Sequence, residues 1–523
     1  MRKILLWVLS LMIGHVCYAD DITIRYNGSS AEVAQKTKDS VTVTVSGAKV
    51  NIESQYTDRL LTLRLKGNSN DGQLVLKTAG KAKIKLDGLN LTSQEGAPLE
   101  LKNKKKVEVV AAKGTENSLT ITACNDTANH KAAVIWAKSK LLLSGKGVLN
   151  IIATGDGCRG IKTKKDVTIE ELTLNVTTTG NHLGEKPFGM GGFPGMPEGG
   201  FQMPAEGFPR MPEGGFQMSA GAIPNFGGFP IGSDSTMHGR FPDFPMGGFP
   251  IGSDSTMQGR FPDFPMGGFP GFGNRDENDS IQGGFGAFGG KHKYVASTKG
   301  IASKGKITIN SGNVTVRTAT AGAEGIEGKQ GVVFNGGNVD VLTPDDAINA
   351  DATIEFNGAQ VLARSTGNDA VDSNPKNGFF TPFGSNEQSD EPAIVIRGGT
   401  VYAWSQVGSP EEGLDCDFAA LIVEGGTVFS VGGGMGEMPS VPTNATAKQP
   451  TVLLIGIDIV KDEPIYICDD KGNILETVIV PFSLRRSASL VGCPLFKVGS
   501  VYTVKTKGYE KTFTLKENFT TVR

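Results

Sequence analysis

A short phrase that recurs between residues 296 and 430 limits the possible folds of this chain more than any other feature. Its copies are spaced by 25, 22, 23 and 43 residues, and they read Gly300-Ile301, Gly325-Ile326, Ala347-Ile348, Ala370-Val371 and Gly413-Leu414. Between the copies, Val, Ile and Thr alternate with other residues and are interrupted by Gly and Asn. A repeat of roughly 20–50 residues indicates a solenoid, and this alternation indicates strands joined by turns. A period in the low twenties therefore predicts one rung of a parallel β-helix for each copy.

The same alternation extends the expected β-helix towards the N-terminus, to about residue 41. Val41-Val43-Val45 places apolar side chains on one face of a strand, and Val167-Ile169 resembles the later Ile307-Ile309. The pattern stops at about residue 182 and resumes at about residue 294. We therefore predict an all-β protein with an N-terminal part of the β-helix over residues 20–182 and a C-terminal part over residues 293–434.

The interruption, residues 183–292, has a different composition, rich in Gly, Phe, Pro and Met. Gly227–Met246 is copied as Gly247–Met266 with one change, His238 to Gln258. A segment with so much Gly and Pro and no apolar period cannot bury a core, so it is predicted to be a disordered insert. Its Phe residues make self-association one hypothesis, and repeat expansion in a tolerated loop is the other.

The two ends of the chain are expected to have separate roles. Residues 1–19 combine Arg2-Lys3 with an apolar run and a small residue at Ala19, which predicts a signal peptide cleaved after Ala19. The mature protein is then secreted, periplasmic or on the cell surface, and no other run is long enough for a transmembrane segment. Residues 435–450 are predicted to be a linker, and residues 451–523 a small β domain or a cap on the solenoid.

Composition excludes several functional classes. The net charge of −2 gives no support for nucleic-acid binding, and no catalytic triad, HExxH motif or cofactor-binding motif is present. The cysteines show no CxxC spacing, so Cys468 and Cys493 are read either as a pair formed after export or as buried thiols. The lysine-rich turn Lys102–Lys106 is read as a solvated turn, with contact to an acidic glycan as the alternative.

Acidic residues gather around the later copies of the phrase. Equivalent positions in a stacked solenoid lie about 4.8 Å apart, where two unit charges repel by about 3.5 kcal/mol at an effective dielectric near 20. Ca²⁺ prefers oxygen ligands of this kind, so we predict calcium binding, with a solvated acidic edge as the rival hypothesis. The candidate metal ligands are Glu324, Glu327, Asp346, Asp351, Asp369, Asp372, Glu412, Asp415 and Asp417.

Two further residue sets bear on function. In Val401-Tyr402-Ala403-Trp404, Tyr402 and Trp404 are expected to point outward, where they could stack on sugar rings or shield the sheet. A calcium-assisted lyase would also need a basic group near the acids, for which Lys304, Lys329 and Arg364 are available. No residue is singled out as catalytic.

The motifs Gly300-Ile301-Ala302-Ser303, Asp345-Asp346-Ala347-Ile348 and Asn368-Asp369-Ala370-Val371-Asp372 resemble a family of secreted bacterial carbohydrate-binding proteins. That family is similar to polysaccharide lyases, and the resemblance implies a right-handed parallel β-helix with bound calcium and no established catalysis. It implies that the repeated acids are calcium ligands, while Asn349 departs from the acidic pattern.

The function expected from the sequence is therefore calcium-stabilised binding of an extended polysaccharide, acidic or cellulose-like, by an exported protein. A calcium-dependent, pectate-type lyase is the first alternative. The second is a structural surface adhesin whose contacts are made by residues 183–292.

Overall fold

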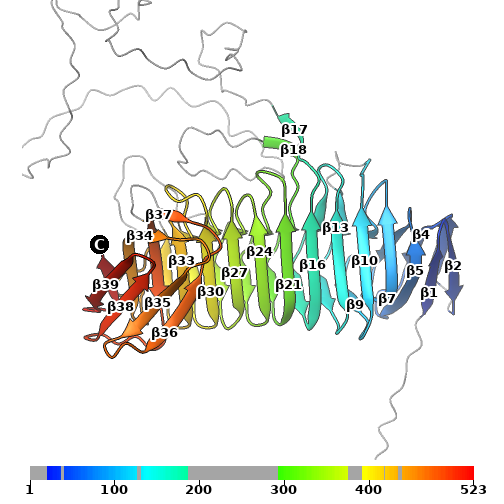
Figure 1. Cartoon of the computed structure of the whole chain (residues 1–523). Helices are drawn as coiled ribbons and strands as arrows, with labels where there is room; N and C mark the ends of the chain where they lie inside the picture. Colours follow the sequence, from blue (N-terminus) through cyan, green and yellow to red (C-terminus); the bar gives the residue numbers. More distant parts are fainter. Residues whose placement is uncertain are drawn as a thin grey trace, which may run out of the picture. The chain divides into compact units, whose positions relative to one another are not determined.

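The protein is described from a computed structural model, which covers residues 21–36, 40–125, 131–186, 293–374, 392–416, 419–433 and 439–523. These residues belong to one compact unit, Met1–Phe188 together with Gln282–Arg523. All of their regular secondary structure is β-strand, arranged mainly as stacked rungs of parallel strands (Figure 1). The predicted all-β fold and parallel β-helix are thus confirmed.

One side of the β-helix is a sheet of 11 strands, here called sheet B, to which each rung contributes one short strand. The recurring phrase starts these strands, since Ile301 pairs with Ile326, Ile326 with Ile348 and Ile348 with Val371. Its strands are β3 (Val41–Ser46), β4 (Lys49–Ser54), β6 (Gln73–Thr78), β8 (Leu99–Leu101), β11 (Ala133–Ala137), β14 (Arg159–Thr163), β19 (Ile301–Ser303), β22 (Ile326–Gly328), β25 (Ile348–Ala350), β28 (Val371–Ser373) and β31 (Leu414–Asp415).

The other sides of the rungs form a larger sheet, sheet A, to which most rungs contribute two strands. The first set is β9 (Val107–Ala111), β12 (Leu141–Ser144), β15 (Val167–Glu170), β20 (Ile307–Ile309), β23 (Val332–Phe334), β26 (Ile354–Phe356), β29 (Pro392–Ile396) and β32 (Ala420–Val423). The second set is β10 (Glu116–Ile121), β13 (Val148–Ala153), β16 (Leu172–Thr178), β21 (Gly312–Thr318), β24 (Asn338–Thr343), β27 (Gln360–Ser365), β30 (Thr400–Ser405) and β33 (Thr427–Gly432). In the earliest rungs the two strands merge into β5 (Leu61–Ser69) and β7 (Ala82–Ser93), and β7 pairs with both β9 and β10.

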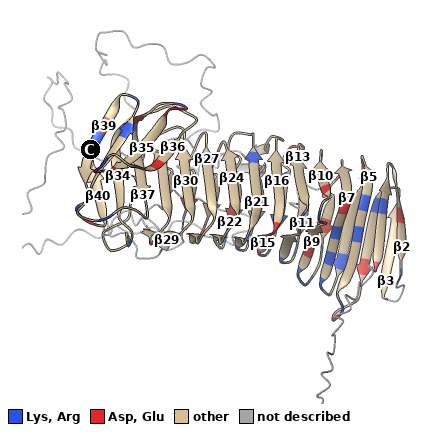
Figure 2. Cartoon of the chain, turned by 60° about the horizontal axis from the view of Figure 1, so that its bottom comes forward, with Lys and Arg blue, Asp and Glu red and all other residues tan. Residues whose placement is uncertain are grey.

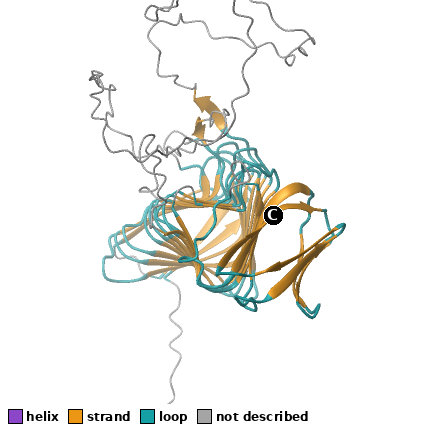
Figure 3. Cartoon of the chain, turned by 90° about the vertical axis from the view of Figure 1, so that its left-hand side faces the viewer, coloured by secondary structure: helices purple, strands orange, loops and turns teal. Residues whose placement is uncertain are grey.

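The core lies inside the rungs, where the strands enclose a column of aliphatic side chains (Figure 3). Alternate residues point inward, as the period of a β-strand requires. Phe334 and Phe356 stack there in successive rungs, with ring centroids 5.0 Å apart. The space is tight at the phrase itself, because a Cβ on Gly325 would lie 2.5 Å from the carbonyl oxygen of Ala347. The apolar residues of the phrase therefore specify the stack.

The segment between the two halves leaves the β-helix at a turn. Ile161 in β14 pairs directly with Ile301 in β19, so rungs far apart in sequence are neighbours in the stack. Leu183–Lys186 forms β17 and pairs antiparallel with β18 (Lys293–Ala296), whereas the insert was predicted to start at residue 183. The rest of that predicted insert, residues 187–292, lies outside the described residues, as does the predicted signal peptide.

Antiparallel strands cover both ends of the stack. At the N-terminal end, β1 (Ile22–Asn27) pairs with β5 and also with β2 (Ser30–Gln35), and β3 pairs antiparallel with β4. At the C-terminal end, β37 (Leu484–Gly492) pairs antiparallel with both β33 and β34 (Thr451–Ile459), and β40 (Phe519–Val522) pairs with β34. These pairings cover both edges of sheet A and the N-terminal edge of sheet B.

Residues 451–523 form both a cap on the solenoid and a small β domain, the two alternatives that the sequence left open. Besides the capping strands, β35 (Pro464–Asp469), β36 (Ile474–Ile479), β38 (Val501–Thr506) and β39 (Tyr509–Thr514) form a separate four-stranded sheet. Part of the segment read as a linker packs on the last rung, since Ala447 is buried and bridges to Val423.

Three global features complete the description. Cys468 and Cys493 are free thiols and do not form the disulfide considered from the sequence. The described part of the chain contains no helix long and apolar enough to cross a membrane. Lys and Arg are concentrated on the N-terminal rungs around β5 and β7 (Figure 2).

Candidate functional site

The predicted acids lie on the outer face of sheet B in two columns. Ile301, Ile326 and Ile348 fill the core, so the residue that follows each of them points outward. Outer column 1 contains Lys299, Glu324, Asp346, Asp369 and Glu412, which backbone hydrogen bonds hold in register from rung to rung. Outer column 2 contains Ala302, Glu327, Asn349, Asp372 and Asp415, which are aligned as strand partners. Seven of the nine predicted carboxylates therefore stand in these columns, whereas Asp351 lies in the turn after β25 and Asp417 lies outside the described residues.

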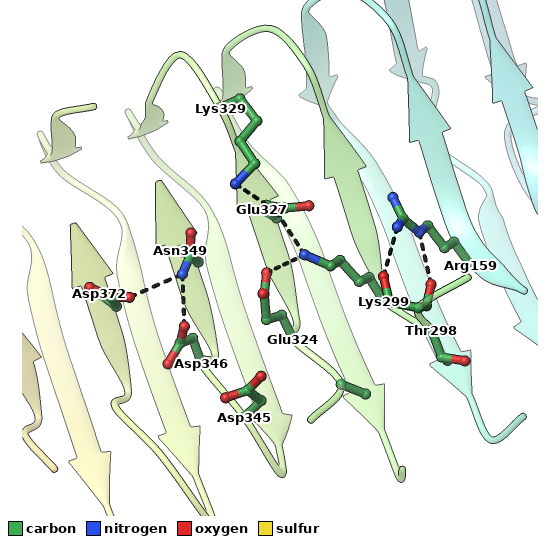
Figure 4. Close-up of polar contacts among 12 residues, drawn as sticks. Arg159, Thr298, Lys299, Glu324, Glu327, Lys329, Asp345, Asp346, Asn349 and Asp372 are labelled. Carbon is green, nitrogen blue, oxygen red and sulfur yellow. Dashed lines mark hydrogen bonds and ion pairs between the residues drawn. The ribbon is translucent and has the colours of Figure 1, made fainter. Parts of the chain in front are cut away.

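Lysines neutralise the acids of the first rungs of these columns, which we call the lysine-paired rungs (Figure 4). Lys299 Nζ lies 2.9 Å from Glu324 Oε2 and 2.7 Å from Glu327 Oε1. Lys329 Nζ lies 2.9 Å from the same Glu327 oxygen and 2.8 Å from Asp351 Oδ1. Three of the predicted calcium ligands, Glu324, Glu327 and Asp351, thus have ammonium partners supplied by the chain.

Amides bind the carboxylates of the following rungs, which we call the asparagine-linked rungs. Asn349 Nδ2 donates to Asp346 Oδ2 at 2.7 Å and to Asp372 Oδ2 at 3.1 Å (Figure 4). Asn368 Nδ2 donates to Asp346 Oδ1 and Asn374 Nδ2 to Asp372 Oδ1, both at 2.7 Å. Hydrogen bonds from neutral amides orient these oxygens but leave their negative charge in place.

The last predicted acids are bound to the chain that follows the final rung. The backbone N–H of Glu412 donates to Asp369 Oδ1. Ser440 N donates to Glu412 Oε2 at 2.6 Å, and Ser440 Oγ donates to Asp415 Oδ1 at 3.2 Å. The segment after the last rung therefore contributes polar groups to the acidic columns.

Glu327 in the lysine-paired rungs and Asp369 in the asparagine-linked rungs have opposite electrostatic character, although at Glu324 burial outweighs Lys299 and raises the pKa of that carboxyl. Burial alone would raise the pKa of Glu327, but the cations Lys299, Lys329 and Arg159 outweigh burial and hold that pKa well below its usual range. Burial raises the pKa of Asp369 well above its usual range, and the neighbouring carboxylates Asp415 and Asp346 raise it further. Charge on Glu327 is compensated within the protein, whereas charge on Asp369 is not.

One atom of the asparagine-linked rungs is of particular interest. Asn349 is fully buried, and its Oδ1 has no hydrogen-bond partner within the described structure. A buried amide oxygen without a donor is costly, and a cation beside it would satisfy it. Since Ca²⁺ accepts amide and carboxylate oxygens together, the residues present fit this ion in donor type. Among the described residues, His, Cys, Asp and Glu side chains form no group of three that could hold a metal by themselves, so amide or backbone oxygens would have to complete the coordination.

The prediction that Tyr402 and Trp404 form a sugar-stacking platform is wrong. Both point outward from sheet A, but that face is covered by the C-terminal residues. Trp404 is 4% exposed within a second core that contains Ile467 and Val491, and it stacks on Tyr402 at 5.7 Å. Tyr402 donates its hydroxyl hydrogen bond to Glu476 at 2.8 Å. The shielding alternative is the one that holds, because residues 451–523 pack on this face.

Two of the basic groups considered as the proton acceptor of a lyase are engaged in ion pairs. Lys329 is held by two carboxylates, which outweigh burial and raise its pKa, so it is poorly suited to accept a proton. Arg364 pairs with Asp340 at 2.5 Å. Lys162, which precedes Ala302 in outer column 2, was not considered; burial, with the cations Arg159 and Lys304, lowers its pKa to about 6.

Sequence reasoning also missed Lys299, although a signal for it existed. Lys299 directly precedes Gly300-Ile301, the position that Glu324, Asp346, Asp369 and Glu412 occupy in the other copies of the phrase. Aligning the copies by that position identifies Lys299 as the cation of the column. The contacts of Asn349 and Asn374 required the structure, because nothing in the sequence says which carboxylates they reach.

Comparison with known proteins supports a carbohydrate-binding role for this β-helix. Residues 46–186 and 269–370 match the family model described as carbohydrate-binding domain-containing protein. The family resemblance noted in the sequence is thereby confirmed over these residues.

A curated relative carries the same description. It is a carbohydrate-binding domain-containing protein of Acetivibrio thermocellus, 28% identical over 144 residues, which are 26% of this chain and 47% of that protein. The match thus spans about half of the relative's length. A solved structure, described as the polysaccharide lyase-like protein from C. thermocellum in a gadolinium derivative, is 17% identical with a TM-score of 0.37, covering 65% of this chain and 90% of that one.

Proposed function

We propose that this chain is an exported carbohydrate-binding protein whose asparagine-linked rungs hold calcium and whose β-helix binds an extended polysaccharide. The family match supports carbohydrate binding. The buried, partnerless Oδ1 of Asn349 among stacked carboxylates is the observation that carries the calcium part of the proposal.

The residues that would hold calcium are Asp346, Asn349 and Asp372, with amide or backbone oxygens completing the coordination. They come from two consecutive rungs, so an ion there would link β25, β28 and the turns before them. Calcium supplies positive charge that offsets the repulsion between these acids. The chain's own part is to orient the oxygens through Asn368 and Asn374 and to keep them largely away from water.

Thermal unfolding of the mature chain with calcium or with a chelator tests this proposal. Saturating calcium at 100 times its dissociation constant should add about 2.7 kcal/mol to the free energy of unfolding. The double variant D346N/D372N should lose that gain, whereas D470N, an exposed aspartate in the C-terminal region, should keep it. Equal calcium responses in all three proteins would contradict the proposed site.

A glycan array tests the carbohydrate part. The mature protein, with calcium present, should bind one or more extended polysaccharides. Binding to no plant, bacterial or algal polysaccharide on the array, with the protein folded by circular dichroism, would overturn the proposed function.

A pectate-type lyase is the alternative that one specific observation favours. Lys162 lies on the same outer face as the acids, has no ion pair among the described residues, and has its pKa lowered to about 6. A neutral lysine can accept a proton next to a uronate carboxyl group. Incubation with polygalacturonate should then give unsaturated product in the wild type and none in K162M; absence of product in both would exclude this alternative. The adhesin hypothesis depends on residues outside the described structure.

A further inference from the structure

A second charged feature, positive this time, follows the turns that lead from each strand of sheet B to the next strand of sheet A. In the N-terminal rungs these turns are unusually rich in lysine. We call them the basic edge, and they comprise residues 77–81, 102–106, 138–140, 164–166 and 304–306. The run Lys102–Lys106 is therefore one turn of a larger pattern that the sequence does not reveal without the rung register.

The lysines of the basic edge are stacked in register. At the start of the turns, Lys102 N donates to Leu76 O, Lys138 N to Leu101 O, and Lys164 N to Ala137 O. These bonds place the following lysines one above the other: Lys77, Lys102, Lys138, Lys164 and Lys304.

A second column stands at the end of the same turns. Ala82 N bonds to Lys106 O, and Val107 N bonds to Lys140 O. The residues in this column are Lys81, Lys106, Lys140, Asp166 and Lys306. Four of these five positions are lysine, so every turn except 164–166 carries positive charge on both sides.

Little of this charge is compensated. Lys77 pairs with Glu53 at 3.4 Å, Lys102 with Glu100 at 3.1 Å and Lys140 with Asp166 at 2.7 Å. The edge lysines with no ion-pair partner among the described residues are Lys81, Lys104, Lys105, Lys106, Lys138, Lys164, Lys165 and Lys306. All eight are exposed.

Such stacking is unfavourable without a partner. Like charges about 4.8 Å apart repel by up to about 1 kcal/mol even in water, and the edge repeats this at each rung. The lysine-paired rungs of sheet B contain their own counterions, whereas most lysines of the basic edge have no ion-pair partner among the described residues. A row of cations along the stacking axis fits an extended polymer with regularly spaced negative groups.

We propose that the basic edge binds a polysaccharide carrying carboxylate or sulfate groups, with the polymer running along the axis of the β-helix. This inference rests on the proposed carbohydrate-binding function and specifies its ligand as anionic. A glycan is favoured over a nucleic acid because the turns at 77–81, 102–106, 138–140 and 164–166 all lie inside the matched family region, and because the whole chain has a net charge of −2.

The test uses the mature full-length protein and four polymers: polygalacturonate, dextran sulfate, neutral dextran and double-stranded DNA. The edge variant replaces Lys104, Lys138, Lys164 and Lys306 by Gln. The control variant replaces Lys461, Lys471, Lys497 and Lys516, four exposed lysines of the C-terminal region, by Gln. The two variants have the same net charge, so any difference between them reports on location.

We expect wild type and control to bind polygalacturonate or dextran sulfate with affinities within twofold of each other, and the edge variant to lose at least tenfold. Added salt should weaken wild-type binding, since exposed charges are screened. If the wild type binds polygalacturonate more tightly, the basic edge prefers carboxylate groups; if it binds dextran sulfate more tightly, the edge prefers sulfate groups. Equal binding by edge and control variants, or tighter binding of DNA than of either anionic glycan, would overturn the inference.

Failure of the inference can be told apart from failure of the proposed function. Binding of neutral dextran or another neutral glycan, unaffected by the edge substitutions, would refute the basic edge and leave carbohydrate binding intact. Binding of no glycan at all by the folded wild type would refute both.

Discussion

The lysine-paired and asparagine-linked rungs of sheet B occupy equivalent positions in successive turns of one β-helix. They differ in the groups that contact their buried carboxylates. Both bury carboxylates on the outer face of the sheet. In the first group, Lys299 and Lys329 lie within 2.9 Å of the acids. In the second, Asn349 and its neighbours donate hydrogen bonds but add no charge.

The difference shows that successive rungs can share one backbone conformation while their outer carboxylates differ in whether they need a cation from solution. A buried ion pair completed within the chain depends on nothing in solution. Buried carboxylates joined by amides depend on pH or on an external cation, because their charge is not compensated. Dependence on calcium is therefore expected to be confined to one part of the stack.

The largest expected effect comes from removing the internal cation. K299M leaves Glu324 and Glu327 buried with one ammonium group fewer, and breaking a buried pair in this way costs about 3–5 kcal/mol. Urea unfolding at pH 7 measures the loss. K448M is the matched control, because Lys448 pairs with Glu424 at 2.6 Å on the exposed surface and its loss should cost under about 1 kcal/mol. Equal losses in the two variants would mean that Lys299 does not compensate a buried charge.

The second expected effect is a pair of opposite pH dependences, measured on chelated protein. Glu327 has a lowered pKa in the folded chain, so its stabilising contribution is present above the ordinary glutamate range and is lost as the pH falls. Asp369 has a raised pKa, so stability is greatest below the ordinary aspartate range and falls as the pH rises through the raised value.

The variants E327Q and D369N separate these contributions. D369N should flatten the loss of stability towards neutral pH and, without calcium, be more stable than wild type by roughly 1 kcal/mol or more at pH 7. E327Q should instead be less stable than wild type at pH 7 and approach it in acid. Parallel pH profiles for wild type and both variants would show that the two groups of rungs do not differ in charge compensation.

The smallest expected effect comes from a neutral column, which serves as the reference for both charged groups. At another turn of the β-helix, Asn335 Nδ2 donates to Asn310 Oδ1 and Asn357 Nδ2 donates to Asn335 Oδ1, both at 2.9 Å. These side chains are exposed, so N335A should cost about 0.5 kcal/mol. Urea unfolding should give the same small loss with calcium or chelator and at pH 5 or 7. A loss that changed with calcium would link this column to the acidic site.

Much of the fold could be predicted, because a period-two pattern repeated at a fixed interval leaves few ways to bury the apolar face. The register Ile301, Ile326, Ile348, Val371 and Leu414 was readable from spacing alone. Of the site, the stacking of the acids was predicted from the same register. Their neutralisation was not predicted: aligning the copies places Lys299 in outer column 1, but which carboxylates Lys299 and Lys329 reach depends on side-chain geometry that no spacing encodes.

The aromatic pair marks the limit of sequence reasoning most clearly. Alternation placed Tyr402 and Trp404 on the outer face of their strand, and the structure agrees. What covers that face depends on how residues 451–523 return to cap the stack, with β37 pairing to β33. Exposure of an outward residue is a property of the whole chain.

By itself, the sequence determined the parallel β-helix, its register and the columns of acids, because all three follow from local periodicity. Only the tertiary structure decided which acids are neutralised by lysines and which aromatic side chains are covered by the C-terminal residues. It also decided that lysines scattered in the sequence form one basic edge. Those outcomes arise from contacts between rungs and with the C-terminal residues, where charge and burial are set by neighbours distant in sequence.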